Sequence, residues 1–147
     1  MKICLNLKNI KIRVVNVIDL MRLVSNDKHP HGLTNDEFDE IFTNNKPIIF
    51  NFHGYPKFIH ELTISRTNKN IDVHGYQEEG TITTAFDMRV QNQIDRYHLF
   101  LSVLDKLKLT EKRKDLVEKI NQILEKHKKY IAKYGVDMPE VANWKWK

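Results

Sequence analysis

Three histidines and three glutamates gather in one stretch near the middle of the sequence. They are His53, His60, His74, Glu61, Glu78 and Glu79. Imidazole and carboxylate side chains commonly bind metal ions or transfer protons in catalysis. The interval from His53 to His60 matches none of the compact zinc patterns, whose ligands lie one helical turn apart or in short pairs. Three hypotheses remain open: a metal site, contacts at strand ends or an interface, and acid–base chemistry with groups of another domain.

Phosphate binding and serine-type hydrolysis require patterns that this sequence does not contain. A phosphate bound by backbone amides needs a glycine-rich turn before a helix, whereas the glycines here stand singly at positions 32, 54, 75, 80 and 135. Arg66 leaves a side-chain contact to a sugar phosphate open. A catalytic serine needs an elbow-like turn, and none of Ser25, Ser65 and Ser102 occupies one.

Strands and helices must hold these side chains in place. Residues 11–17 are rich in β-branched residues and predict a largely buried strand, followed by a short helix at 19–23. The run 47–52 predicts a second buried strand, and 71–76 a third. Thr34 and Glu37 predict a capping box that begins a helix ending near Asn44. Pro56 suits the first position of a helix after the second strand.

A polar segment and two amphipathic helices follow the third strand. Residues 77–85 are rich in threonine and predict a loop, and open α/β sheets bind ligands or partners in such loops. Apolar residues recur with helical spacing from Asp87 to Leu107, and again from about Glu111 to Tyr134 with Gly135 as the C-cap. The helical core residues that the sequence predicts are Phe38, Ile41, Phe42, Phe58, Ile59, Leu62, Val90, Ile94, Tyr97, Leu101, Leu104, Leu116, Ile120, Ile123, Leu124, Ile131 and Tyr134.

The alternation of strands and helices predicts an α/β fold in a single domain over residues 1–147. Parallel strands need crossover connections, so helices would cover both faces of the sheet. No apolar run is long enough for a membrane helix, and the first residues lack the continuous apolar stretch of a signal peptide. Cys4 is the only cysteine, so no internal disulfide forms. We therefore expect a cytoplasmic protein without a membrane partner.

The net charge of +5 comes entirely from the C-terminal part of the chain. Residues 1–105 carry 12 Lys/Arg and 13 Asp/Glu, whereas residues 106–147 carry 12 and 6. The basic run at residues 126–133 could attract nucleic acid, but acids are interleaved and Glu125 with Lys129 is a favourable helix pair. We interpret the run as a solvated helix face and expect no nucleic-acid partner. Trp144 and Trp146 could dock a partner or fold back on the domain.

Seven short strings occur in an order and spacing that resemble one enzyme family. They are His29-Pro-His-Gly-Leu33, Asn51-Phe-His-Gly-Tyr-Pro56, Arg66-Thr-Asn68, His74-Gly-Tyr-Gln-Glu-Glu-Gly-Thr-Ile-Thr-Thr84, Phe86-Asp-Met-Arg-Val-Gln-Asn92, Asp95-Arg-Tyr-His98 and Asp137-Met-Pro-Glu140. Together they resemble the C-terminal domain of xylulose 5-phosphate/fructose 6-phosphate phosphoketolase, from about Lys11 to Trp146. Ser65, Gln77 and Ala85 depart from the family's pattern, in which basic, basic and proline residues are expected.

The resemblance implies a parent enzyme of three domains that uses thiamine diphosphate and Mg²⁺. Such an enzyme cleaves a ketose phosphate with inorganic phosphate to acetyl phosphate and a shorter aldose phosphate. In the family the cofactor and catalytic groups belong to upstream domains, and this sequence has no Gly-Asp-Gly motif to which they could be transferred. We therefore expect no catalytic, cofactor or metal residue here. The resemblance implies a noncatalytic domain that packs against the upstream domains of a homodimeric enzyme.

The same resemblance implies a fold and a set of contact residues. The family's domain resembles that of transketolase, a three-layer sandwich in which helices flank a mostly parallel mixed sheet. Polar residues at strand ends would then face other domains or approach the substrate channel. The candidate contact residues are His53, Tyr55, His60, Arg66, His74, Tyr76, Glu78, Glu79, Thr83 and Thr84. The alternatives are the equivalent domain of another transketolase-like enzyme, or a stand-alone interaction or nucleic-acid-binding domain.

Overall fold

The computed structural model describes residues 10–77 and 82–145. In these residues two parallel strands, β1 (Ile48–Phe52) and β2 (Ile71–Gly75), form the sheet. They pair in register, from Ile48 opposite Ile71 to Phe52 opposite Gly75. Helix α2 (Pro56–Thr63) connects them. This crossover connection confirms the predicted α/β fold with parallel pairing.

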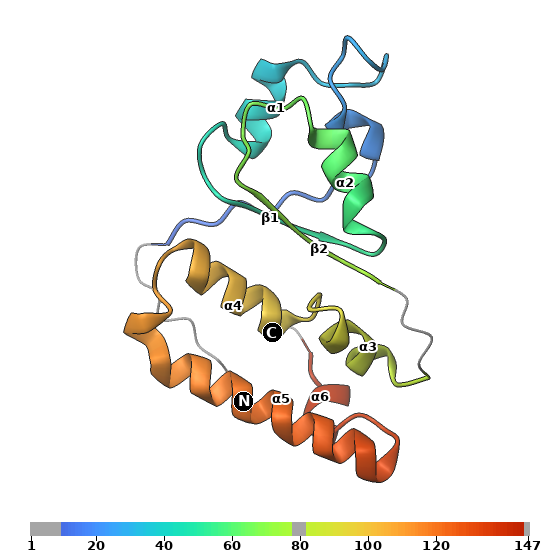
Figure 1. Cartoon of the computed structure of the whole chain (residues 1–147), viewed down its shortest axis with the longest axis vertical. Coiled ribbons are helices and arrows are strands. Elements are labelled where there is room, and N and C mark those ends of the chain that lie inside the picture. The colour runs from blue at the N-terminus through green and yellow to red at the C-terminus, as the bar shows by residue number, and fades with distance from the viewer. Residues whose placement is uncertain (1–9, 78–81, 146–147) are drawn as a thin grey trace.

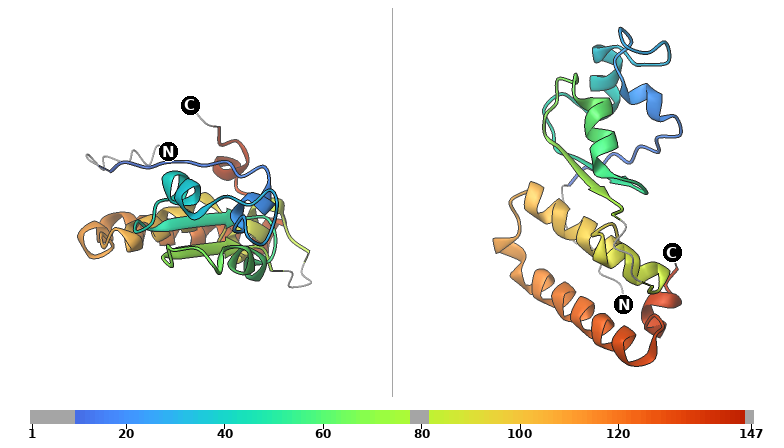
Figure 2. Two further views of the ribbon diagram at one scale, coloured as in Figure 1. Left: turned by 90° about the horizontal axis from the view of Figure 1, so that it is seen from above. Right: turned by 45° about the vertical axis from the view of Figure 1, so that its right-hand side comes forward.

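Helices lie on both sides of this sheet (Figure 1). The 3-10 helix η1 (Leu20–Leu23), α1 (Asn35–Phe42) and α2 occupy one side. Helix α4 lies on the other, where it contacts β1, while α2 contacts β2. The right-hand view of Figure 2 shows α4 between the strands and the long helix α5. The remaining bounds are α3 (Ala85–Gln91), α4 (Arg96–Lys106), η2 (Glu111–Arg113), α5 (Lys114–Tyr134) and α6 (Pro139–Ala142).

Local sequence signals explain several helix ends. The Thr34 hydroxyl accepts from the Glu37 amide at 3.2 Å, and the Glu37 carboxylate accepts from the Thr34 amide at 2.8 Å, so the predicted capping box is confirmed. Pro56 begins α2, as predicted. Gly135 ends α5 with a left-handed φ of 66°, which confirms the predicted C-cap.

The main core lies between the sheet and the helices on the α2 side. Its buried residues are Leu23, Leu33, Phe38 and Ile59, with Phe50, Phe52 and Val73 of the strands packed against them. Leu104 and Ile120 are buried as predicted, whereas Phe58 and Tyr134 are 44% and 54% exposed. Among the described residues, none of the helices is both long enough and apolar enough to span a bilayer.

The prediction of a buried strand at residues 11–17 is wrong. This segment has no regular secondary structure, and Ile12 and Val14 are 63% and 89% exposed. The Arg13 guanidinium connects the segment to the domain by donating to the carbonyls of Glu40 and Ile41 at 2.5 and 2.8 Å, and Val17 packs against the core. β-Branched residues favour a strand when a neighbouring strand and a packed surface are available. Their presence in residues 11–17 does not provide that neighbouring strand.

The single helix predicted from Asp87 to Leu107 is two helices. α3 ends at Gln91, Gln93 takes a left-handed φ of 57°, and the Asp95 carboxylate caps α4 by accepting from the amides of Tyr97 and His98. The apolar spacing continues through this break, so periodicity did not reveal it. Asp87 lies in the first turn of α3, as predicted, and Thr84 provides the cap.

The tail after α6 folds back on the helices. The Arg96 guanidinium lies 4.6 Å from the Trp144 ring, 4.8 Å from Phe86 and 4.7 Å from Tyr97. A guanidinium among aromatic faces is a favourable cation–π arrangement. Of the two alternatives for the tail, Trp144 therefore takes the folded-back one, and Trp146 lies outside the described residues.

Candidate functional site at the carboxyl ends of the strands

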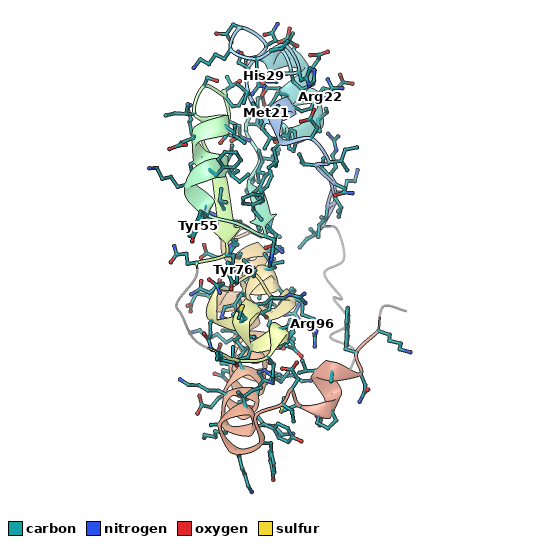
Figure 3. The ribbon with its side chains drawn as sticks, turned by 90° about the vertical axis from the view of Figure 1, so that its right-hand side faces the viewer. Met21, Arg22, His29, Tyr55, Tyr76 and Arg96 are labelled. Carbon is teal, nitrogen blue, oxygen red and sulfur yellow. The ribbon has the colours of Figure 1, made fainter. Side chains whose placement is uncertain are left out.

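The carboxyl ends of β1 and β2 bring three candidate residues together. His53 follows β1 and Tyr76 follows β2, so the parallel register places both at one edge of the sheet. Their ring centroids lie 5.3 Å apart, and the Tyr76 amide donates to the Gly54 carbonyl at 2.8 Å. Tyr55 belongs to the same loop and is 59% exposed. Figure 3 shows Tyr55 and Tyr76 well separated from His29 at the far end of the domain.

A close backbone approach holds these two loops together. A Cβ atom at Gly75 would lie 2.5 Å from the Pro56 ring and 2.6 Å from the Gly54 carbonyl. Any side chain there would clash, so glycine permits the contact between the end of β2 and the start of α2. The Tyr76 hydroxyl also reaches the Met88 sulfur at 2.7 Å, which ties the same edge to α3. The edge is therefore a fixed surface built from three elements.

His74 points to α4 instead of joining this surface. Its Nε2 lies 2.9 Å from the Ser102 hydroxyl and 3.7 Å from the Asp72 carboxylate. A serine triad needs the serine and the carboxylate on opposite ring nitrogens, whereas both approach Nε2 here. The Lys106 ammonium also reaches Asp72, at 3.3 Å. These contacts join β2 to α4 and lack the arrangement of a serine triad.

The three histidines that suggested a metal site do not assemble into one in the described part of the chain. His53 and His60 are exposed, whereas His74 is partly buried under α4. No group of three or more potential ligands comes together among residues 10–77 and 82–145. Glu61 pairs with Lys57 at 3.6 Å on the surface of α2. The candidates Glu78 and Glu79 lie outside the described residues.

Thr83 and Thr84 belong to a network that we name the His127 cluster: Thr83, Thr84, Asp87, His127 and Asp137. Thr83 donates to the Asp87 carboxylate at 2.7 Å, and Thr84 donates to Asp137 at 2.5 Å. The Nε2 atom of His127 lies 3.5 Å from Asp137 and 4.0 Å from Asp87. His127 is only 1% exposed, so the cluster joins α3, α5 and the turn before α6 in the interior.

Arg66 is also an interior residue. It is 1% exposed, and its guanidinium donates to five backbone carbonyls and one side-chain oxygen. These acceptors belong to Arg22, Leu23, Val24, Leu33, Thr34 and Asn35. The guanidinium also lies 4.4 Å from the Phe38 ring. Its donors are used within the domain.

The candidate residues therefore divide into two groups. Arg66, His74, Thr83 and Thr84 make contacts within the domain, whereas His53, Tyr55 and His60 are exposed. Imidazole and phenol groups can exchange hydrogen bonds with another polypeptide or a polar ligand. The exposed group offers a contact surface, with no pairing of a nucleophile to a base among its described members.

The basic side chains of α5 are partly paired with acids. Lys129 lies 3.3 Å from Glu125, and Lys126 lies 3.7 Å from Glu140. These exposed pairs are consistent with the interpretation of a solvated helix face.

Three interior or partly buried polar residues were not predicted from the sequence: His127 and Asp95, which are buried, and Asp137, whose side chain is 20% exposed. His127 falls on the apolar stripe of α5, at helical spacing between Ile120 and Ile131. A polar residue on such a stripe signals either an interior partner or a site. Asp95 directly precedes a helical run, which is the usual cap signal. Asp137 lies within one of the strings that carry the resemblance.

Comparisons with known proteins agree with this resemblance. The family described as the XFP C-terminal domain matches residues 3–146. The chain is 47% identical to "Probable phosphoketolase" of Clostridium acetobutylicum over 142 residues, which are 96% of this chain and 18% of that protein. It is 51% identical to the Chlorobaculum tepidum protein of the same name and 52% identical to the Nitrosospira multiformis one, over 93% of this chain and 18% and 17% of those proteins.

The chain thus spans about a fifth of the length of the curated relatives that it matches. The family match covers residues 3–146 of this chain, which include all seven strings and both loops at the carboxyl ends of β1 and β2. On this basis the chain belongs to the XFP C-terminal domain family, the C-terminal domain of phosphoketolases.

Proposed function

We propose that this chain is a noncatalytic packing domain of a phosphoketolase. The full-length enzyme cleaves xylulose 5-phosphate or fructose 6-phosphate with inorganic phosphate to give acetyl phosphate and an aldose phosphate. In this proposal the enzyme is a cytoplasmic homodimer whose catalytic centre, thiamine diphosphate and Mg²⁺ belong to the polypeptide outside this chain. The domain contributes the exposed surface at the carboxyl ends of β1 and β2.

One observation supports the noncatalytic role. The polar side chains best suited to bind an anion or transfer a proton form hydrogen bonds within the domain. A general acid, base or anion-binding group must reach the substrate. The Arg66 guanidinium is bound to carbonyls of its own domain, and the Thr84 hydroxyl is bound to Asp137. These groups stabilise the domain. Of the candidate contact residues, His53, Tyr55 and His60 are exposed and able to contact another part of the enzyme.

The residues of this chain do not fit a thiamine diphosphate site. The sequence lacks a Gly-Asp-Gly motif, and the described residues do not gather three oxygen or nitrogen ligands for a metal ion. We therefore assign no step of the reaction to this chain.

A full-length chimera tests the proposal. This chain would replace the matched 142 residues of the Clostridium acetobutylicum protein, and acetyl phosphate formation would be measured with xylulose 5-phosphate, inorganic phosphate, thiamine diphosphate and Mg²⁺. We expect an active chimera and an inactive isolated chain. His53→Ala and Tyr55→Phe in the chimera should reduce activity less than tenfold if these residues serve packing alone, since one acid–base group contributes about 10²–10⁴-fold.

Two results would contradict the proposal. Acetyl phosphate released by the isolated chain would show that it is catalytic. A folded but inactive chimera, beside an active parental enzyme, would show that this chain is not an equivalent C-terminal domain. Circular dichroism and size-exclusion chromatography establish that each protein is folded before its activity is compared.

A further inference from the structure

A groove of about 1060 Å³ runs along one edge of β1. Its lining includes every residue from Lys46 to Phe52, together with Val103 and Leu107 of the α4 region. Side chains on a strand alternate between the two faces of the sheet. A groove that touches consecutive residues therefore lies at the strand's edge. Among the described residues β1 pairs with β2 alone, so this edge lacks a neighbouring strand.

Residues 10–13 and 15–18 also line this groove, and Val14 lies between them in the chain. Their exposed apolar side chains are Ile12 at 63%, Val14 at 89%, Val15 at 38% and Ile18 at 91%. Arg13 holds the segment to the end of α1, and Val17 packs against the core, so the segment has a defined position. Val14–Val15 and Val17–Ile18 are adjacent apolar pairs. Adjacent side chains of an extended segment point to opposite faces, so such pairs are typical of a segment covered on both faces. Here one side meets the groove and much of the rest faces water.

Scattered apolar residues on a surface are ordinary, but a strip of exposed apolar side chains beside an unpaired strand edge marks an interaction site. This strip is residues 10–18, in which Lys11, Arg13 and Asn16 interrupt the apolar residues. The strip lies near the N-terminal end of the matched region, and the relatives carry more than four-fifths of their length outside that region. Because the match is to a C-terminal domain, the additional polypeptide of such proteins precedes it. That polypeptide is joined close to the strip and is present at a high effective concentration.

We propose that the strip at residues 10–18 and the open edge of β1 form the docking surface for the polypeptide that precedes this domain in the full-length enzyme. The preceding segment covers Ile12, Val14 and Ile18 with apolar side chains and supplies backbone partners along the edge, as in strand addition. This inference rests on the proposed function, because it takes the domain to be part of a longer phosphoketolase.

Hydrogen exchange in the isolated chain and in the chimera tests the docking surface. We expect the amides of residues 12–18 to exchange at least about tenfold more slowly in the chimera, because docked backbone is removed from water. Exchange at equal rates in the two proteins would overturn the inference. Sedimentation of the isolated chain is measured in parallel to detect a dimer. If the isolated chain dimerises and its residues 12–18 exchange more slowly as the protein concentration rises, a second copy occupies the surface. That result would also overturn the inference.

Val14→Asp supplies the second test, with Val136→Asp as a matched control. Val136 is 54% exposed in the turn after α5, away from the groove. In the isolated chain both changes should shift the midpoint of thermal unfolding by less than about 2 °C. In the chimera Val14→Asp should lower the midpoint of this domain by about 4 °C or more and restore fast exchange at residues 12–18, whereas Val136→Asp should not. Equal effects of the two changes in the chimera would contradict the inference.

A milder variant and the activity assay keep the outcomes distinguishable. If the Val14→Asp chimera does not fold, Val14→Thr retains the shape while adding a hydroxyl, and it should shift the midpoint in the same direction by a smaller amount. Protection at residues 12–18 in a chimera that forms no acetyl phosphate would support the docking surface and contradict the proposed function. Acetyl phosphate formation by a chimera without protection at residues 12–18 would support the proposed function and contradict the docking surface.

Discussion

Arg66 shows how one side chain can replace regular secondary structure. The segment from Arg22 to Thr34 contains little helix or strand, yet the Arg66 guanidinium binds carbonyls near both of its ends. Burial lowers the pKa of this guanidinium, but the ordinary pKa of arginine is so high that the group stays charged at neutral pH. The charge strengthens each hydrogen bond to a carbonyl.

We predict that Arg66→Ala lowers the free energy of unfolding by about 3–5 kcal/mol, because it leaves several buried carbonyls without a donor. Arg66→Lys should lose less than Arg66→Ala, because an ammonium still donates to some of these carbonyls. It should remain less stable than the wild type, because it has fewer donors than a guanidinium and no planar fork. Urea unfolding followed by tryptophan fluorescence measures both. Arg22→Ala is the control, because its side chain is exposed and its carbonyl remains. A loss no larger than that of the control would contradict this role.

Glu37 gives the capping box a dependence on pH. Hydrogen bonds from the amide and then the hydroxyl of Thr34 hold the pKa of Glu37 below its usual value. A carboxylate with a lower pKa in the folded state adds stability above its unfolded pKa, and this stability is lost as pH falls through the folded pKa. We predict that the urea midpoint of the wild-type chain falls more steeply than that of Glu37→Gln below about pH 4.3.

Glu40→Gln is the matched control for this prediction, because Glu40 is an exposed glutamate on the same helix. The Glu40 variant should keep the steep fall of the wild type. An equal slope in the wild type and Glu37→Gln would show that the capping box does not titrate as the hydrogen bonds indicate.

At the scale of elements, the sequence predicted the helix ends and strands that nearby residues determine. It did not predict the features that depend on contacts with distant parts of the chain. The capping box, the Pro56 start, the Gly135 end and both sheet strands follow from nearby residue types. Residues 11–17 have the composition of a buried strand, but no neighbouring strand pairs with them within the described chain. The break before Asp95 lies inside an unbroken apolar spacing, because Val90 of α3 is partly buried, and Ile94 of the connection and Leu104 of α4 are buried.

Asp95 is the residue on which this break depends. It is 2% exposed and accepts from the Tyr97 amide at 2.8 Å and the His98 amide at 3.4 Å. We predict that Asp95→Ala lowers the free energy of unfolding by about 2 kcal/mol, because a buried helix cap is lost. Asp95→Asn should lose about half as much, since its carbonyl oxygen can still accept.

Asp105→Ala is the control for Asp95, as it removes an exposed acid near the other end of the same helix. Its effect should be within about 0.5 kcal/mol, and of stabilising sign, because a negative charge is unfavourable at a helix C-terminus. Urea unfolding monitored by circular dichroism compares the three variants. Equal losses for Asp95→Ala and Asp105→Ala would contradict the assigned cap.

At the scale of the whole molecule, the sheet lies between two sets of helices, and polar contacts connect the strands to the set that contains α3 and α4. The Asn51 side chain donates to the Ile94 carbonyl at 3.3 Å, the Gln77 amide donates to the Asn92 side chain at 2.5 Å, and Lys106 reaches Asp72. The last pair is only partly buried, with side chains 27% and 35% exposed. Water screens such a pair, so the ion pair contributes little to the free energy of unfolding.

We predict that apolar packing on α4 dominates over this ion pair. Leu104→Ala should lower the free energy of unfolding by about 2–5 kcal/mol, because Leu104 is fully buried. Lys106→Met keeps the aliphatic stem and should cost less than about 1 kcal/mol. Chemical denaturation of both variants decides the order. A larger loss for Lys106→Met would show that electrostatics holds α4 in place.

The candidate site was predictable in position but not in the direction of its side chains. The sequence placed His53 and Tyr76 at strand ends, and the parallel register brings them together. It could not show that His74 faces Ser102 or that Arg66 is buried, because a side chain's face depends on the packing of α4 and of the segment before α1. The sequence shows which side chains are present. The direction in which each side chain points depends on how the helices pack against the sheet.

The buried guanidinium of Arg66 also determines where the domain tolerates mutation. It binds mainly main-chain oxygens, which every amino acid possesses, so it places almost no requirement on the side chains of Arg22, Val24 or Leu33. Selection acting through this network falls on position 66 and largely spares the positions it holds. A library of substitutions at the exposed positions of that segment, leaving the core residues Leu23 and Leu33 and the tightly packed Gly32 unchanged, should accordingly retain many folded variants. The same library at position 66 should retain almost none.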